Sequence, residues 1–272
     1  MNAVAILGAG ELGATLARLL VDRQAARRVF LVDADESRAQ GKALDLRQAG
    51  PVERSDTSVE GRARLPGVGT FDALVVADPP ELIEPNPLPL RLADLARTLR
   101  PALGEAPLVV AHAAPAPLVE AFVEGGVPPV RVLGSAAVAW SSALRRSIAV
   151  ELGVAAREVV ATVVGLPPDL VPVGVVVGGL TPEALPARAL FRAGERLRGR
   201  SFGPVALAHA ALAVLHALEH MPPSSLPVVA ARAGAPALGV PARIGGGRIV
   251  ELPELPLDPR TRVALENAAA RR

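Results

Sequence analysis

The sequence predicts an α/β protein whose first half is a parallel β-sheet covered by helices. Short apolar runs alternate with amphipathic helical segments through the first 133 residues, a pattern typical of parallel sheets with right-handed crossovers. The first apolar run, residues 2–7, leads directly into a glycine-rich turn that opens a helix. With 272 residues, half of them hydrophobic, the chain is long enough for one large core or two coupled domains.

The N-terminal half is expected to contain short strands joined mainly by helices. The strands are expected at residues 2–7, 29–32, 62–65, 71–77, 108–112 and 130–133, and the helices at residues 12–23, 36–48, 90–100 and 118–124. The second helix is expected to turn Leu44 inward. Residues 50–60 are a predicted polar loop, and the proline-rich residues 79–89 are expected to lack regular structure.

The C-terminal half changes in character from Ser135 onward. Helices are expected at residues 138–152, 186–200, 205–220 and 259–271, and strands at residues 159–164, 173–177, 228–231, 237–244 and 247–252, the last three as an antiparallel set. No repeat or low-complexity linker separates the halves, so we expect one compact unit with a boundary near Gly134. The expected domains are residues 1–134 and residues 135–272.

The glycine-rich turn has the spacing of a dinucleotide site. Gly8, Gly10 and Gly13 stand in G-x-G-x-x-G register between a strand and a helix. The first glycine allows the tight turn, the second lets a pyrophosphate approach the backbone, and the third lets the helix pack closely. Asp33 follows at the end of the next strand, where a carboxylate can bind an adenosine ribose.

This context predicts a Rossmann domain. The residues expected to contact the cofactor are Gly8, Gly10, Glu11, Leu12, Gly13 and Asp33. The alternative is a turn that keeps its glycines for packing and binds nothing.

The composition argues against several classes of protein. The chain has no cysteine, which excludes disulfides, thiolate metal sites and a cysteine nucleophile. The net charge is +2 and aromatic residues make up 2%, so we expect no nucleic-acid partner. No apolar run is long enough for a membrane helix and no signal segment precedes the first strand, so we expect a cytoplasmic protein without a membrane anchor.

Four stretches of the chain carry a resemblance to a known family. They are GAGELGATLARLL, RRVFLVDADESRAQGKALDLRQAGPVE, RSIAVELGVAAREVVATVVG and ALGVPARIGGGRIVELPELPLDPRTRVALENAAA. On these stretches the sequence resembles the lactate and malate dehydrogenases, the malate type most closely, over nearly the whole chain. The resemblance implies NAD as cofactor, a mixed α+β C-terminal domain, and a homo-oligomer (a dimer or tetramer) built partly through the long helices.

The positions that carry this family's chemistry are substituted in this chain. In the family a histidine moves the hydroxyl proton, an aspartate orients it and an arginine binds the substrate carboxylate. When the motifs are matched by their neighbouring residues, Pro167 in VVGLPPDLVP takes the position of the histidine. In VAWSSAL, Trp140 takes the position of the aspartate and Ala143 that of the arginine. His112 stands where the family has an asparagine after the fifth strand. We therefore expect no catalytic residue of the family type.

The histidines leave two readings open. His112 is either a strand-end histidine bound to the backbone or a substitute acid–base group. His209, His216 and His220 share one helical stretch, and the last two are four residues apart, which suits a metal pair. No third ligand has a fitting spacing, so no metal site is expected.

Three functions remain in order of preference. The first is a catalytically degenerate homologue, a pseudoenzyme that keeps nucleotide binding and acts as a regulatory or partner subunit. The second is an active NAD-dependent oxidoreductase that acts on a different 2-hydroxy or 2-oxo acid. The third is a structural or interaction protein whose nucleotide turn is a relic.

Overall fold

In a computed structural model of the protein, residues 1–78, 89–198, 200–232, 235–254 and 263 are described. The strands of the N-terminal half are β1 (Ala3–Leu7), β2 (Arg28–Val32), β3 (Ser58–Arg62), β4 (Ala73–Val76), β5 (Leu108–Val110) and β6 (Val132–Gly134). All pair in parallel, in the order β3-β2-β1-β4-β5-β6, which is the doubly wound order of a Rossmann sheet. The predicted parallel α/β fold is therefore confirmed.

Helices cover this sheet, which explains why its central strands are apolar at every position. They are α1 (Glu11–Asp22), α2 (Glu36–Ala49), α4 (Pro89–Leu103) and α5 (Ala116–Glu124). The four residues of β4 are all buried, as expected for a parallel strand with both faces covered. The side chains of α1 that pack inward are Leu12, Leu16, Leu20 and Val21.

The second half continues the same sheet with antiparallel strands. Its elements are α6 (Ala136–Leu152), β7 (Val159–Leu166), β8 (Asp169–Val177), α7 (Ala187–Leu197), α8 (Pro204–Glu219), β9 (Ser224–Ala230), β10 (Leu238–Gly245) and β11 (Arg248–Glu251). The sheet passes from β6 to β9 where Gly134 pairs with Val229, and then runs β9-β10-β7-β8, with β11 on β10. Three short 3-10 helices lie at Pro129–Arg131, Ala156–Glu158 and Pro182–Ala184.

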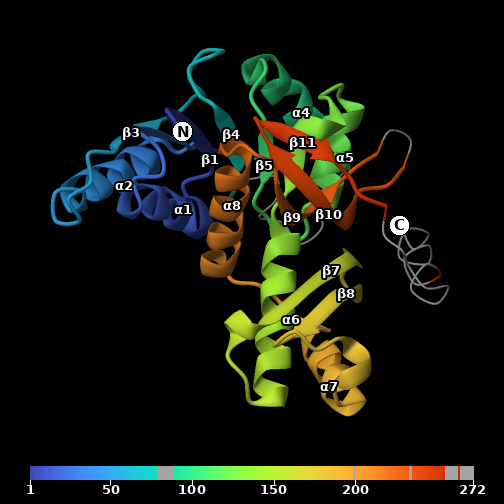
Figure 1. The fold of residues 1–272 in the computed structure, drawn as a ribbon. Coiled ribbons are helices and arrows are strands. Elements are labelled where there is room, and N and C mark those ends of the chain that lie inside the picture. The colour runs from blue at the N-terminus through green and yellow to red at the C-terminus, as the bar shows by residue number, and fades with distance from the viewer. Residues whose placement is uncertain (79–88, 199, 233–234, 255–262, 264–272) are drawn as a thin grey trace.

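Two helices connect the halves. Figure 1 shows α6 extending from the parallel sheet to the β7–β8 hairpin and α7. Helix α8 packs against both α1 and α6, so it joins the first helix of the chain to the second half. Within the described residues, none of the helices combines the length and the apolar character needed to cross a membrane.

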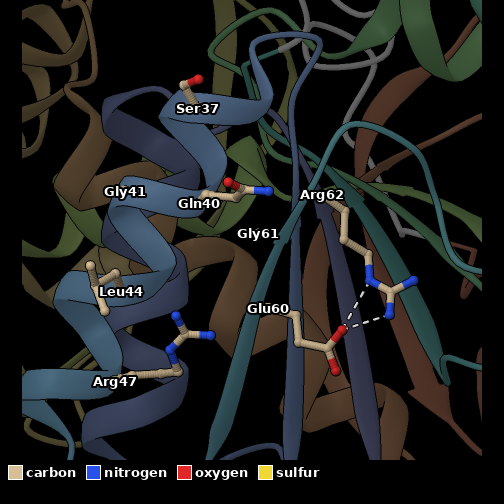
Figure 2. Close-up of a pocket in the computed structure, with 8 residues that line it drawn as sticks. All are labelled: Ser37, Gln40, Gly41, Leu44, Arg47, Glu60, Gly61 and Arg62. Atoms are coloured by element: carbon tan, nitrogen blue, oxygen red, sulfur yellow. Dashed lines mark hydrogen bonds and ion pairs between the residues drawn. The ribbon is translucent and has the colours of Figure 1, made fainter.

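The inward position expected for Leu44 is wrong. Its side chain is 48% exposed, whereas Ala39, Ala43 and Leu46 form the buried face of α2. The reason lies in the opposite strand, because a Cβ on Gly61 of β3 would overlap the backbone carbonyl of Ala39. The helix lies so close to the strand that small side chains fill much of the contact, and Leu44 falls on the outer side (Figure 2).

Several segment boundaries also differ from the expectation. Strands β8 and β9 each begin four residues earlier than expected, at Asp169 and Ser224. Strand β3 begins at Ser58, inside the segment 50–60 predicted as loop, and it ends at Arg62, where a strand was expected to begin. Among the described residues it is an edge strand that pairs with β2 alone, and such strands tolerate exposed charged side chains that hide the alternating pattern. Pro89 is the first residue of α4, where its fixed φ suits a helix start. Residues 79–88 and the helix expected at 259–271 lie outside the described residues, apart from position 263.

The close approach of α2 to β3 predicts opposite effects of two glycine substitutions. Gly61→Ala should lower the free energy of unfolding by about 1–3 kcal/mol, because the new methyl meets backbone that cannot move independently. Gly41→Ala, at an exposed position of α2, should raise it by about 0.5–1 kcal/mol, because an added Cβ there meets no atom within 4 Å and alanine favours the helix. Urea unfolding of both variants checks this, and equal effects would contradict the packing described.

Candidate functional site

Three strand ends meet at the carboxyl edge of the parallel sheet. Strand β1 lies between β2 and β4, so the residues that follow these strands are neighbours: Gly8 after β1, Asp33 after β2 and Asp78 shortly after β4. In open α/β sheets this switch point, where the strand order reverses, is where ligands bind.

The glycine turn has the backbone geometry expected from its spacing. Gly8 has a φ of +103°, which L side chains rarely adopt, and its N–H donates to the Val32 carbonyl at 2.7 Å. A Cβ on Gly13 would overlap the Gly8 carbonyl oxygen, so this glycine lets α1 pack directly on the turn. Glu11 is exposed at the start of α1, and the side chain of Leu12 is buried in the core.

Asp33 is turned toward the protein backbone. One carboxylate oxygen accepts the N–H of Ala9 at 2.8 Å, and the other accepts the N–H of Asp35 at 2.9 Å. Its first oxygen also lies 3.7 Å from a guanidinium nitrogen of Arg38, and the residue is only 7% exposed. Asp33 therefore ties the glycine turn to the end of β2. Each oxygen keeps a second acceptor position, so a role in holding a ribose stays a prediction.

Asp78 is the site residue that sequence reasoning missed. Its Oδ2 accepts the N–H of Gly13 at 2.6 Å, and the N–H of Leu12 also donates to its carboxylate. A Cβ on Gly10 would lie 2.7 Å from Cγ and 2.9 Å from Cβ of Asp78. The space that Gly10 leaves open thus contains the Asp78 side chain. The signal in the sequence is an acidic residue just after the strand that neighbours the glycine turn.

The protonation of Asp78 is set by opposing influences. Burial is the largest, and it raises the pKa of the carboxyl group above its usual value. The N–H groups of Gly13 and Leu12 and the nearby His112 lower the pKa, while the carboxylate of Asp33 raises it. The net direction is upward, so the ionised form is less favourable here than in water.

NAD fits only part of this site. Asp33 has the position of a ribose-binding carboxylate, and the turn has the glycines that a pyrophosphate needs. A pyrophosphate at this helix N-terminus, however, would lie against the Asp78 carboxylate, which already accepts the Gly13 N–H and carries negative charge when ionised. The phosphate half of the dinucleotide therefore does not fit while Asp78 stays in place.

A cavity of about 400 Å³ lies between the β5–α5 connection, α6 and the β7–β8 hairpin. It is lined by Ala113, Ala114, Pro115, Ala116, Pro117, Glu120, Trp140, Leu166, Pro167, Arg200, Ser201 and Phe202. The structure thus brings together Trp140 and Pro167, the two residues that the sequence resemblance predicts at the family's aspartate and histidine positions. Ala143 packs against the core and is not among the lining residues.

The side chains of this cavity are poorly suited to acid–base work. Pro167 belongs to the two-residue connection between β7 and β8, and Trp140 is 1% exposed. Its indole N–H has no hydrogen-bond partner in the described part of the chain. Glu120 accepts the N–H of Ala237 at 2.7 Å, so this carboxylate holds backbone.

His112 lies just beyond β5 with its ring held against the backbone. Its Nδ1 is 3.2 Å from both the carbonyl oxygen and the amide nitrogen of Ala114. It does not line the cavity, and the group it influences is Asp78. The ring is therefore close enough to Asp78 to lower the pKa of that carboxyl group.

The remaining histidines form no metal centre among the described residues. His216 and His220 meet edge to face with ring centroids 6.4 Å apart, and Nδ1 of His220 lies 2.6 Å from the His216 carbonyl oxygen. Burial lowers the pKa of His216. In the described ranges, His, Asp and Glu side chains nowhere gather in a group of three that could hold a metal ion.

Another, open hollow of about 630 Å³ lies along α2 and β3 and reaches Arg62 at the carboxyl end of β3. Figure 2 shows its lining residues, with Glu60 and Arg62 joined by an ion pair at 2.6 Å. Leu44 and Gly61 also line it. The lining residues do not include the glycines of the turn, so this hollow is separate from the candidate nucleotide site.

Comparison with known proteins agrees with this fold. Residues 2–76 match the family model described as lactate/malate dehydrogenase, NAD binding domain. The malate dehydrogenase of Chloroherpeton thalassium is 30% identical over 98% of this chain and 94% of its own length. That of Thermomicrobium roseum is 31% identical with the same coverage. The crystal structure of malate dehydrogenase from Salinibacter ruber is 26% identical, with a TM-score of 0.85 over 99% of this chain and 94% of that chain.

These likenesses extend over both halves of the chain and confirm the resemblance inferred from the four sequence stretches. The matched domain is one that binds NAD, which makes NAD a candidate cofactor. The chain belongs to the lactate/malate dehydrogenase family.

Proposed function

We propose that this chain is a catalytically degenerate member of its family, a pseudoenzyme that acts as a nucleotide-responsive subunit or partner-binding protein. The observation that carries the proposal is the pairing of Trp140 and Pro167 in one cavity. These residues stand at the positions that match the family's aspartate and histidine, so the substitutions fall together in space as well as in sequence.

The chemistry of the cavity supports this proposal. Reduction of a 2-oxo acid requires a proton donor within hydrogen-bond reach of the carbonyl oxygen, and neither proline nor an indole serves as one. The carboxylate of Glu120 holds the Ala237 N–H, and Arg200 is a permanent cation. Loss of a positioned acid–base group alone costs about 10²–10⁴ in rate.

A structural or interaction protein with a relic turn is the second candidate. The observation that favours it is the Asp78 side chain in the space above Gly10. In that case the glycines serve packing within the chain, and no nucleotide enters.

The organisation of the chain follows from the same proposal. Residues 1–134 would form the nucleotide-binding part and residues 135–272 the degenerate catalytic part. The family resemblance supports a homo-oligomer and a cytoplasmic location.

The proposal predicts that the protein does not turn over 2-oxo acids. With NADH and oxaloacetate, pyruvate or larger 2-oxo acids, we expect a rate below about a thousandth of that of the Thermomicrobium roseum malate dehydrogenase measured in parallel, because proton transfer is missing. The decrease of NADH absorbance is the measurement. The Asp78→Ala variant is assayed beside the parent protein, so that failure to bind NADH is not mistaken for failure of chemistry.

Turnover of any tested acid would contradict the proposal. If that turnover disappeared in His112→Ala, it would identify an active oxidoreductase that uses this histidine. Turnover that survived the substitution would point to another proton donor.

A further inference from the structure

We propose that the Asp78 carboxylate is a built-in anion in the phosphate turn, which a dinucleotide must displace before it binds. The inference rests on the proposed role of the glycine turn as a nucleotide site. It assigns to Asp78 the control of affinity at that site.

The first argument is that Asp78 uses the groups a phosphate would use. Its carboxylate accepts the N–H of Gly13 at 2.6 Å and the N–H of Leu12, both in the first turn of α1. Unpaired N–H groups at a helix N-terminus, with the positive end of the helix dipole, are what bind a pyrophosphate in this type of turn. In this structure the Asp78 carboxylate already accepts the N–H groups of Gly13 and Leu12.

The second argument is that the Asp78 backbone has little freedom to withdraw. The N–H of Ala77 donates to the Leu7 carbonyl at 2.9 Å, and the N–H of Asp78 approaches the same oxygen at 3.4 Å. A Cβ on Gly8 would lie 2.7 Å from both Cα and the carbonyl carbon of Asp78, so the two backbones are in contact. Displacement must therefore come from rotation or protonation of the side chain.

The third argument concerns charge. The groups that face Asp78 are the N–H donors of α1, the carboxylate of Asp33 from the end of β2, and His112 from the end of β5. A dinucleotide phosphate in this setting would add negative charge beside two carboxylates. If only a small fraction of molecules has Asp78 turned away, the apparent Kd rises by the inverse of that fraction.

Stability should depend on pH through the same group. The raised pKa means that folding favours protonated Asp78, so its contribution to stability is complete below the ordinary value of 3.8 and is lost as the pH rises through the raised value. The wild type should therefore gain stability relative to Asp78→Asn as the pH falls from about 8 to about 4. Urea unfolding of both proteins over this range is the measurement, and parallel curves would contradict the assignment.

The binding experiment compares Asp78→Asn and Asp78→Ala with the wild type. NADH is titrated by its fluorescence, and ADP-ribose and adenosine are titrated by calorimetry. Asp72→Asn is the matched control, because Asp72 also accepts backbone N–H groups, those of Asn2 and Ala3, at the opposite end of β1. Thermal unfolding without ligand confirms that each variant is folded.

The expected result is tighter binding of NADH and ADP-ribose by about tenfold or more in both Asp78 variants, because the competing anion is gone. Adenosine, which carries no phosphate, should bind all proteins alike, and Asp72→Asn should match the wild type. The wild type should also bind ADP-ribose more tightly as the pH is lowered, and this dependence should be smaller in Asp78→Asn. This last measurement tests the proposal even if a variant fails to fold.

Two outcomes would overturn the inference. One is that the wild type and the Asp78 variants all bind NADH with the same affinity. This result would contradict the role of Asp78 but would leave the nucleotide-binding role of the turn intact. The other is no binding by any variant at millimolar NADH, which would favour the relic turn. Both outcomes are measured by binding alone. The turnover assay described above therefore tests the proposed loss of catalysis independently of this inference.

Discussion

The parallel pairing of β1 with β2 and β4 is the constraint on which the rest of the site depends. It places Gly8, Asp33 and Asp78 at one edge of the sheet, although they come from three separate segments of the chain. Gly13 then lets α1 pack on the turn and aim its N–H groups at this edge. A residue that follows β4 therefore lies in front of the N-terminus of α1, and in this protein that residue is Asp78.

The two parts of the site share one physical feature, because in each a carboxylate is paired with backbone of the same chain. In the glycine turn, a donor available to an external phosphate is taken by the Asp78 carboxylate. In the cavity, which Pro167 and Trp140 also line, the carboxylate of Glu120 accepts the N–H of Ala237. Contacts within the chain thus occupy polar groups that could otherwise bind a ligand.

Much of the fold could be predicted from the sequence because its signals are local. The glycine spacing and the apolar strands need only short-range information, and the sheet, the family and the backbone roles of Gly8 and Gly13 were expected from them. Asp78 could not be found this way, because its partner Gly13 is 65 positions away and the contact exists only once β1 and β4 pair. Leu44 was misplaced for a related reason, since periodicity does not reveal how closely Gly61 lets α2 approach β3.

Trp140 also gives the protein a spectroscopic property. The chain contains one tryptophan and no tyrosine, so near-ultraviolet emission arises essentially from a single indole. That indole is buried and lines the cavity formed with Pro167 and Phe202. Its emission therefore reports on the polarity of this one compartment, in the native protein and without an attached dye. Entry of a molecule into the cavity is thus an optically detectable event.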